Sequence, residues 1–195
     1  MTTTNRQHKS MGHCSITDST NPHFQMVLEQ LLPLAIKSNV VAHDYFKAYQ
    51  AVALPLKQEQ PKQLYGVIIE LGQEGGCDLL AAYANCFANF TNVQEGVPKV
   101  WERPDANFDA LITDVLEAGL LMLPNMPQWD ADFEQPVARG WMRIHLLSSQ
   151  GVYSGEAPLE EMAHSPYGEE MTAATQMLMN WLAVTDLKEH EPVSR

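Results

Sequence analysis

The sequence predicts an α+β protein built on a single antiparallel sheet of about five strands, packed by helices. Two strand-like tracts, 64–71 and 140–147, carry polar residues at alternate positions and lie far apart in the chain. Turn residues at 72–76 close the first tract, and helical apolar spacing marks the segments on either side of the strands. We therefore expect the order helix, helix, three strands, helix, two strands, helix.

The composition is that of a globular protein with one domain. The chain has 195 residues, of which 45% are apolar and 18% charged, enough to bury one core. We expect a single domain over 22–185, a disordered tail at 1–21 and a frayed end at 186–195. The tail is polar and lacks the apolar stretch of a signal peptide, so we expect a cytoplasmic protein. Three cysteines without CxxC spacing favour free thiols in a reducing compartment.

Charge is unevenly distributed along the chain and limits the kinds of partner. Residues 1–104 contain 9 acids and 8 bases, whereas 105–195 contain 15 acids and 4 bases, which accounts for the net charge of −12. Nucleic acids and anionic membranes are bound through clustered Lys and Arg, so we expect neither as a partner. An acidic half can attract a basic protein segment, but it also serves as a solvated face that keeps a protein in solution.

Two helices are expected before the sheet. Asn21 and Pro22 form a helix entry signal, and apolar residues then recur at helical spacing as far as Pro33. A second apolar stripe runs over 40–52. Prolines and polar residues over 54–63 indicate a linker into the first strand.

Residues 77–90 fit two interpretations, a helix or a strand hairpin. The apolar residues have helical spacing, and the alanines favour a helix. As two strands, the segment would turn at Asn85 and Cys86, where Asn tolerates the positive φ of a tight turn.

A resemblance favours the hairpin. The chain resembles a family of uncharacterised bacterial proteins over about residues 64–180, in the runs 66–72, 80–85, 141–147, 151–153 and 164–167. In that family an Asp-Gly-like turn occupies the position of Asn85 and Cys86, which implies two strands here. The shared motifs are structural and imply no activity.

The second half of the domain is expected to contain a helix, a hairpin and a last helix. An acidic first turn starts the helix at Asp105, and Pro124 ends it. Tracts 140–147 and 152–155 should pair around 148–151. In the last helix, 168–184, we expect one set of residues to face the core: Met171, Ala174, Leu178, Trp181 and Leu182. This order of elements and the acidic charge resemble type III secretion chaperones, which bind extended protein segments, commonly as dimers.

The polar face of tract 140–147 is the predicted contact surface. Trp141, Arg143 and His145 alternate with apolar residues and so share one face of the strand, and Glu70 points in the same sense from the first strand. Trp and Arg are the residues that most often anchor protein interfaces. We expect a protein partner or a homodimer, bound by Trp141 as apolar anchor, Arg143 as paired cation, and His145 and Glu70 as polar orienters. The plainer interpretation is a solvated sheet face.

Two other functions are also compatible with the sequence. His145 with Glu70 could serve a small hydrolase or transferase in a pocket closed by 124–139, and a cavity between sheet and helices could sense a small ligand. No nucleotide-binding, nucleophile-elbow or zinc motif is present, so no cofactor or metal is expected. The tail has four soft metal donors without the spacing of a structural zinc site: His8, Met11, His13 and Cys14.

Overall fold

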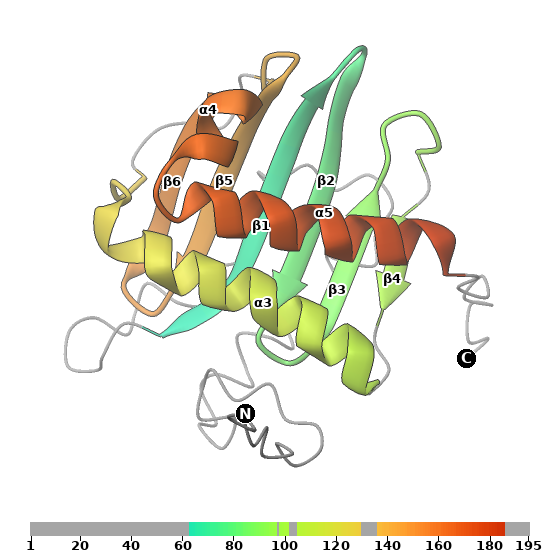
Figure 1. Cartoon of the computed structure of the whole chain (residues 1–195), viewed down its shortest axis with the longest axis horizontal. Helices are drawn as coiled ribbons and strands as arrows, with labels where there is room; N and C mark the ends of the chain where they lie inside the picture. The colour runs from blue at the N-terminus through green and yellow to red at the C-terminus, as the bar shows by residue number, and fades with distance from the viewer. Residues whose placement is uncertain (1–62, 97, 102–104, 130–135, 186–195) are drawn as a thin grey trace, which may run out of the picture.

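The computed structural model describes residues 63–96, 98–101, 105–129 and 136–185. These residues form a six-stranded antiparallel sheet in the order β4-β3-β2-β1-β5-β6, with α3 and α5 lying side by side across one face (Figure 1). The α+β class with one antiparallel sheet packed by helices is therefore confirmed. The elements are β1 Leu64–Gln73, β2 Gly76–Tyr83, β3 Phe87–Thr91, β4 Pro98–Trp101, α3 Ala106–Met122, the 3-10 turn η2 Leu123–Asn125, β5 Trp141–Ser148, β6 Gly151–Pro158, α4 Leu159–His164 and α5 Gly168–Val184.

Several predicted segments lie outside the described residues. These are the tail with its four metal donors, the two helices over 22–52, the linker and the end at 186–195. They stay predictions.

The structure adds two elements that the sequence did not predict, β4 and α4. Strand β4 has four residues and pairs with β3 from Thr91 opposite Pro98 to Ala88 opposite Trp101. Its four residues are all half-buried, so it shows no alternation from which a strand could be predicted. Helix α4 has six residues, too few to show helical periodicity.

Residues 77–90 belong to two strands, as the family resemblance implies. Strands β2 and β3 pair from Tyr83 opposite Phe87 to Leu79 opposite Thr91. The turn differs from the prediction, because Cys86 adopts the positive φ, at 62°, that we expected at Asn85. The side chain of Asn85 instead accepts a hydrogen bond from the backbone N–H of Phe87 at 3.3 Å.

The helix-facing side of the sheet is apolar and tightly packed. Helix α3 starts at Asp105, whose carboxylate accepts hydrogen bonds from the N–H groups of the first turn. It lies so close to β1 and β5 that a Cβ at Gly119 would stand 2.8 Å from Val67 and 3.2 Å from Leu146. The predicted division of these strands into an apolar and a mixed face is therefore confirmed on the apolar side.

Helix α5 has the predicted bounds, but one of its residues was placed on the wrong side. Met171, Leu178 and Leu182 are buried as expected, whereas Trp181 is 45% exposed. The indole touches the core only along one edge, against Phe108 at a centroid distance of 5.9 Å.

Candidate functional site

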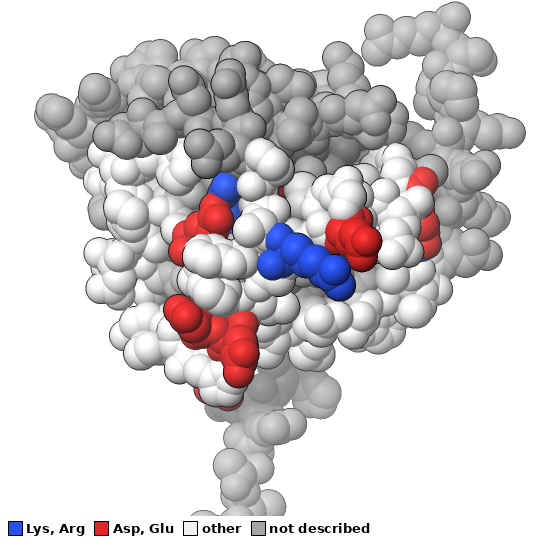
Figure 2. All heavy atoms as spheres, turned by 90° about the horizontal axis from the view of Figure 1, so that it is seen from above, with Lys and Arg blue, Asp and Glu red and all other residues white. Residues whose placement is uncertain are grey.

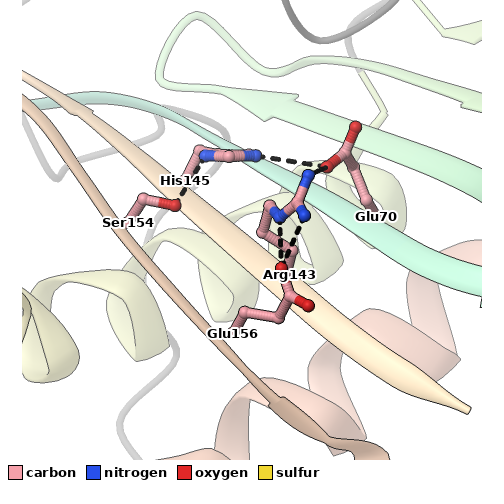
Figure 3. Close-up of polar contacts among 5 residues, drawn as sticks. All are labelled: Glu70, Arg143, His145, Ser154 and Glu156. Carbon is pink, nitrogen blue, oxygen red and sulfur yellow. Dashed lines mark hydrogen bonds and ion pairs between the residues drawn. The ribbon is translucent and has the colours of Figure 1, made fainter. Parts of the chain in front are cut away.

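Five polar side chains gather on the face of the sheet opposite α3 and α5. The register of three adjacent strands sets them there: Glu70 of β1 lies opposite Arg143 of β5, which lies opposite Glu156 of β6. One step along the same face, His145 lies opposite Ser154. We call these five residues the polar network (Figure 3).

Arg143 is the centre of the polar network. Its guanidinium lies 3.1 Å from a carboxylate oxygen of Glu70 and 2.6 Å from one of Glu156. His145 Nε2 lies 3.4 Å from the same Glu70 oxygen, and the Ser154 hydroxyl lies 2.8 Å from His145 Nδ1. With the proton on Nε2, His145 donates to Glu70 and accepts from Ser154, so the carboxylate, ring and hydroxyl form one continuous chain.

The polar network is buried except for Glu156 at its rim, which differs from the open surface that the sequence predicted. Glu70 and Arg143 are 6% exposed, and His145 is fully buried. Of the four predicted contact residues only Trp141 is exposed, at 37%. Alternation along a strand shows which residues share a face, but it does not show whether another part of the chain covers that face.

Part of the cover comes from the segment after η2. Trp129 stands edge-on to the His145 ring at 6.0 Å. The segment reaches this place by pairing with the outer edge of β6, where Trp129 N–H donates to Val152 and Ser154 N–H donates to Pro127. The expectation that Trp129 holds this loop to the body of the protein agrees with these contacts.

Burial also determines the charge of the polar network. Desolvation lowers the pKa of His145 below its ordinary value, and the adjacent Glu70 carboxylate only partly opposes this effect. At neutral pH the imidazole is therefore uncharged. The charged part is then Arg143 between two carboxylates, an arrangement in which each ion has a partner.

Ser154, His145 and Glu70 contact one another in the order of a nucleophile, a base and a carboxylate. General-base activation of a serine requires a hydrogen bond of this length, but it also requires that a substrate reach the hydroxyl. Ser154 is only 2% exposed. The Ser154–His145 contact therefore meets the distance requirement of an acid–base pair, while the burial is that of a structural network.

Other reactive groups in the described residues are poor candidates. Burial, with the Glu70 charge nearby, raises the pKa of Cys77 to about 11, so its thiol stays protonated and weakly nucleophilic. Within the described ranges no three His, Cys, Asp or Glu side chains are grouped so that they could hold a metal ion.

The outer face of α5 is a second candidate site, which the sequence reasoning missed. Met177, Trp181 and Val184 are 52%, 45% and 80% exposed, and their spacing of four and three residues puts them on one side of the helix. We call these three residues the α5 stripe. Ala173 is also exposed on this side, one turn earlier. The signal was present in the sequence, as a second apolar row beside the one that is buried.

Trp181 is held in place by an aromatic stack. Its ring meets Phe108 of α3 edge-on, and Phe108 stacks on Trp101 of β4 with centroids 3.9 Å apart and planes 14° apart. An exposed indole fixed in this way loses little conformational entropy when it binds. The α5 stripe therefore contains a preorganised apolar anchor.

The helical layer is strongly acidic. Helices α3, α4 and α5 contain seven Asp and Glu and no Lys or Arg. The described part of the chain has three Lys and Arg, and each lies within 4 Å of a carboxylate: Lys99 near Glu95, Arg139 near Glu74, and Arg143 in the polar network. Figure 2 shows the same pattern on the upper side of the molecule, where the few basic groups lie directly beside acidic ones.

Both edges of the sheet are protected in the described part of the chain. The segment 127–129 occupies part of the β6 edge. At the other edge β4 is only four residues long and begins with Pro98, which has no N–H to donate. Strand addition from another chain is therefore a poor explanation for binding here.

No family model, curated protein or solved structure matches this chain. Among the described helices, none has the length and apolar content needed to span a membrane.

Proposed function

We propose that this chain is a non-enzymatic protein-binding module whose contact surface is the outer face of α5. The observation that carries the proposal is the α5 stripe, in which three large apolar side chains are exposed side by side on a helix whose other side packs against the core. Single exposed apolar residues are ordinary, but a row at helical spacing that includes a Trp is typical of a protein interface. The resemblance to secretion chaperones, which bind protein segments, agrees with this proposal.

This surface replaces most of the one that the sequence suggested. Arg143, His145 and Glu70 are used by one another inside the protein, so they are not available to a partner. Trp141 remains at the sheet corner beside Leu159, and both are 37% exposed. The protein therefore offers two exposed tryptophans on different surfaces, which makes a direct comparison possible.

The test is capture of binding partners by the full chain and by two matched variants, Trp181→Ser and Trp141→Ser. We expect Trp181→Ser to lose the partner and Trp141→Ser to retain it, because only Trp181 belongs to the α5 stripe. Circular dichroism should show that both variants are folded. A further variant, Met177→Gln, keeps the Trp181–Phe108 contact and should also weaken capture.

The reverse result, with capture lost only in Trp141→Ser, would assign the interface to the sheet corner. Capture that is equal in all variants would contradict a specific protein-binding role for either surface.

A second candidate function follows from the chain of Ser154, His145 and Glu70. The Ser154–His145 contact of 2.8 Å has the length that an acyl-transfer serine and its base require, and the 3.4 Å contact of His145 with Glu70 is slightly longer. A fluorophosphonate probe, which reacts with activated serines, tests it on the full chain. Labelling that disappears in Ser154→Ala would support a hydrolase, whereas the 2% exposure of Ser154 leads us to expect no labelling.

A further inference from the structure

We propose that the segment bound at the α5 stripe is a basic amphipathic helix of another protein. This inference rests on the proposed function and adds the chemistry of the partner. It combines the apolar row of α5 with the acidic outer row of the neighbouring helix α3.

The outer row of α3 lies beside α5 and continues from the N-terminal end of the α5 stripe. Ala110, Asp114, Glu117 and Leu121 are all exposed and follow one another at helical spacing. The two helices run side by side in opposite directions (Figure 1), and contact between Phe108 and Trp181 fixes their alignment. Each residue advances about 1.5 Å along a helix, so Asp114 lies level with about residue 175. The acidic row therefore starts near Met177, the first residue of the stripe, and continues toward the start of α5, with Glu117 level with about residue 172.

The dimensions suit a helix as the occupant. Met177 and Val184 are seven residues apart, which is about 10 Å along the axis, or two turns. A partner helix with apolar residues at positions i, i+4 and i+7 has the same repeat. In the turns of such a helix that extend past Met177 toward the start of α5, Lys or Arg residues on the side facing α3 would meet Asp114 and Glu117.

Charge distinguishes between possible occupants. A second copy of this chain would place two acidic helical layers against each other, because a two-fold contact uses the same surface on both copies. An anionic membrane or a nucleic acid would be repelled by the same carboxylates. A cationic protein segment is attracted to this layer, since the helices hold seven acids and no Lys or Arg.

The experiment is a titration of the full chain with labelled peptides, followed by fluorescence anisotropy. The probe is a helical peptide with leucine on one face and lysine on the other, and its matched peptide has glutamate in place of each lysine. We expect the lysine peptide to bind at least about tenfold more tightly than the glutamate peptide, and to weaken as salt is added.

Two sets of variants locate the binding. The pair Met177→Ser and Trp181→Ser should weaken binding of the lysine peptide at least about tenfold, because the apolar anchors are lost. Neutralising the acidic row with Asp114→Asn and Glu117→Gln should weaken it by roughly three- to tenfold.

The control for net charge is the pair Glu160→Gln and Glu161→Gln. It removes the same charge from exposed positions on α4, which lies on the opposite side of α5 from α3 (Figure 1). We expect this pair to have a much smaller effect on binding than the pair on α3.

The outcomes separate this inference from the proposed function. Equal binding of both peptides that is lost in the Met177 and Trp181 variants would overturn the cationic partner but leave the docking surface standing. Lysine-peptide binding that ignores the stripe variants would reveal diffuse attraction and overturn the inference. Binding to zwitterionic lipid vesicles, or a mass in solution that doubles through the stripe, would overturn it in favour of a membrane or a second copy.

Discussion

Replacing Arg143 by Met tests whether the polar network is as buried in solution as the structure shows. The substitution keeps an unbranched side chain of similar length and removes the charge from between Glu70 and Glu156. The Glu156 side chain is 30% exposed and can regain water, whereas the Glu70 side chain is 8% exposed and cannot. The cost therefore comes mainly from one stranded carboxylate. Breaking one buried pair in this way costs about 3 kcal/mol in unfolding free energy.

The measurement is urea unfolding of the full chain, followed by circular dichroism. With a slope of about 2 kcal/mol per molar urea, a loss of about 3 kcal/mol lowers the midpoint by roughly 1.5 M. Arg139→Met is the matched control, because its ion pair with Glu74 has a similar length, 3.3 Å, but side chains that are 75% and 86% exposed. We expect that variant to change the unfolding free energy by less than about 0.5 kcal/mol.

A double variant shows where the cost arises. Adding Glu70→Gln to Arg143→Met removes the stranded charge and leaves an amide that still reaches His145. We expect the double variant to recover about 2 kcal/mol of the loss, since replacing a buried ion pair by uncharged groups is often nearly neutral. Equal effects of Arg143→Met and Arg139→Met, or strict additivity of the two changes in the double variant, would refute the reasoning.

Three further predictions concern pH, reactivity and packing. Because burial lowers the pKa of His145, the unfolded chain binds more protons than the folded chain just below pH 6.5. The unfolding free energy should therefore fall as the pH drops there, by up to about 1.4 kcal/mol per pH unit. His145→Gln should flatten this pH dependence, as measured by urea unfolding. With its pKa raised to about 11, the thiol of Cys77 should react with iodoacetamide at neutral pH about a hundredfold more slowly than in the urea-unfolded chain, as peptide mass spectrometry would show; similar rates would contradict its burial. Gly119→Ala places a methyl group 2.8 Å from Val67 and should lower the thermal midpoint through a loss of about 1–3 kcal/mol, and an unchanged midpoint would show that α3 can move away from the sheet.

The sequence was most informative where one local signal determined one element. The acidic turn at Asp105 predicted the start of α3, and in the structure the Asp105 side chain caps that turn. The bounds of α5 at 168 and 184 also agree with the structure. Strands β1 and β5 were recognised from alternation. Strand β1 extends beyond the predicted tract 64–71 to Gln73, and β5 is shifted by one residue from the predicted tract 140–147.

The candidate site was less predictable because it depends on register between distant strands. Glu70 and Arg143 are 73 residues apart, and no local pattern shows that they face each other. Ser154 lay within the predicted tract 152–155 but was set aside because it has no nucleophile-elbow context, and Glu156 lay beyond that tract, since strand β6 extends to Pro158. The position of the positive φ in the turn could not be predicted from residue preferences. Strand pairing on both sides imposes it on Cys86, although a cysteine rarely adopts a positive φ.

The last helix shows why periodicity alone did not find the contact surface. Apolar residues occupy two rows of α5, one buried through Leu178 and one exposed through Met177, and Trp181 lies between them with one edge on Phe108. Spacing gives both rows the same weight; only packing against the sheet tells them apart.

Polar and apolar groups are thus placed opposite to the simplest expectation: the mixed face of the sheet is interior, and part of an apolar helix face is exposed. This arrangement separates two kinds of effect. Uncharging Arg143 should lower stability and leave peptide binding by the folded protein unchanged, because its ion pairs with Glu70 and Glu156 lie on the face of the sheet opposite α5. Changing Met177, which is 52% exposed, should weaken binding and leave the unfolding midpoint nearly unchanged. If the two variants instead affected both properties equally, the polar network and the α5 stripe would have to be parts of one coupled site, and the assignment of one to structure and the other to recognition would fail.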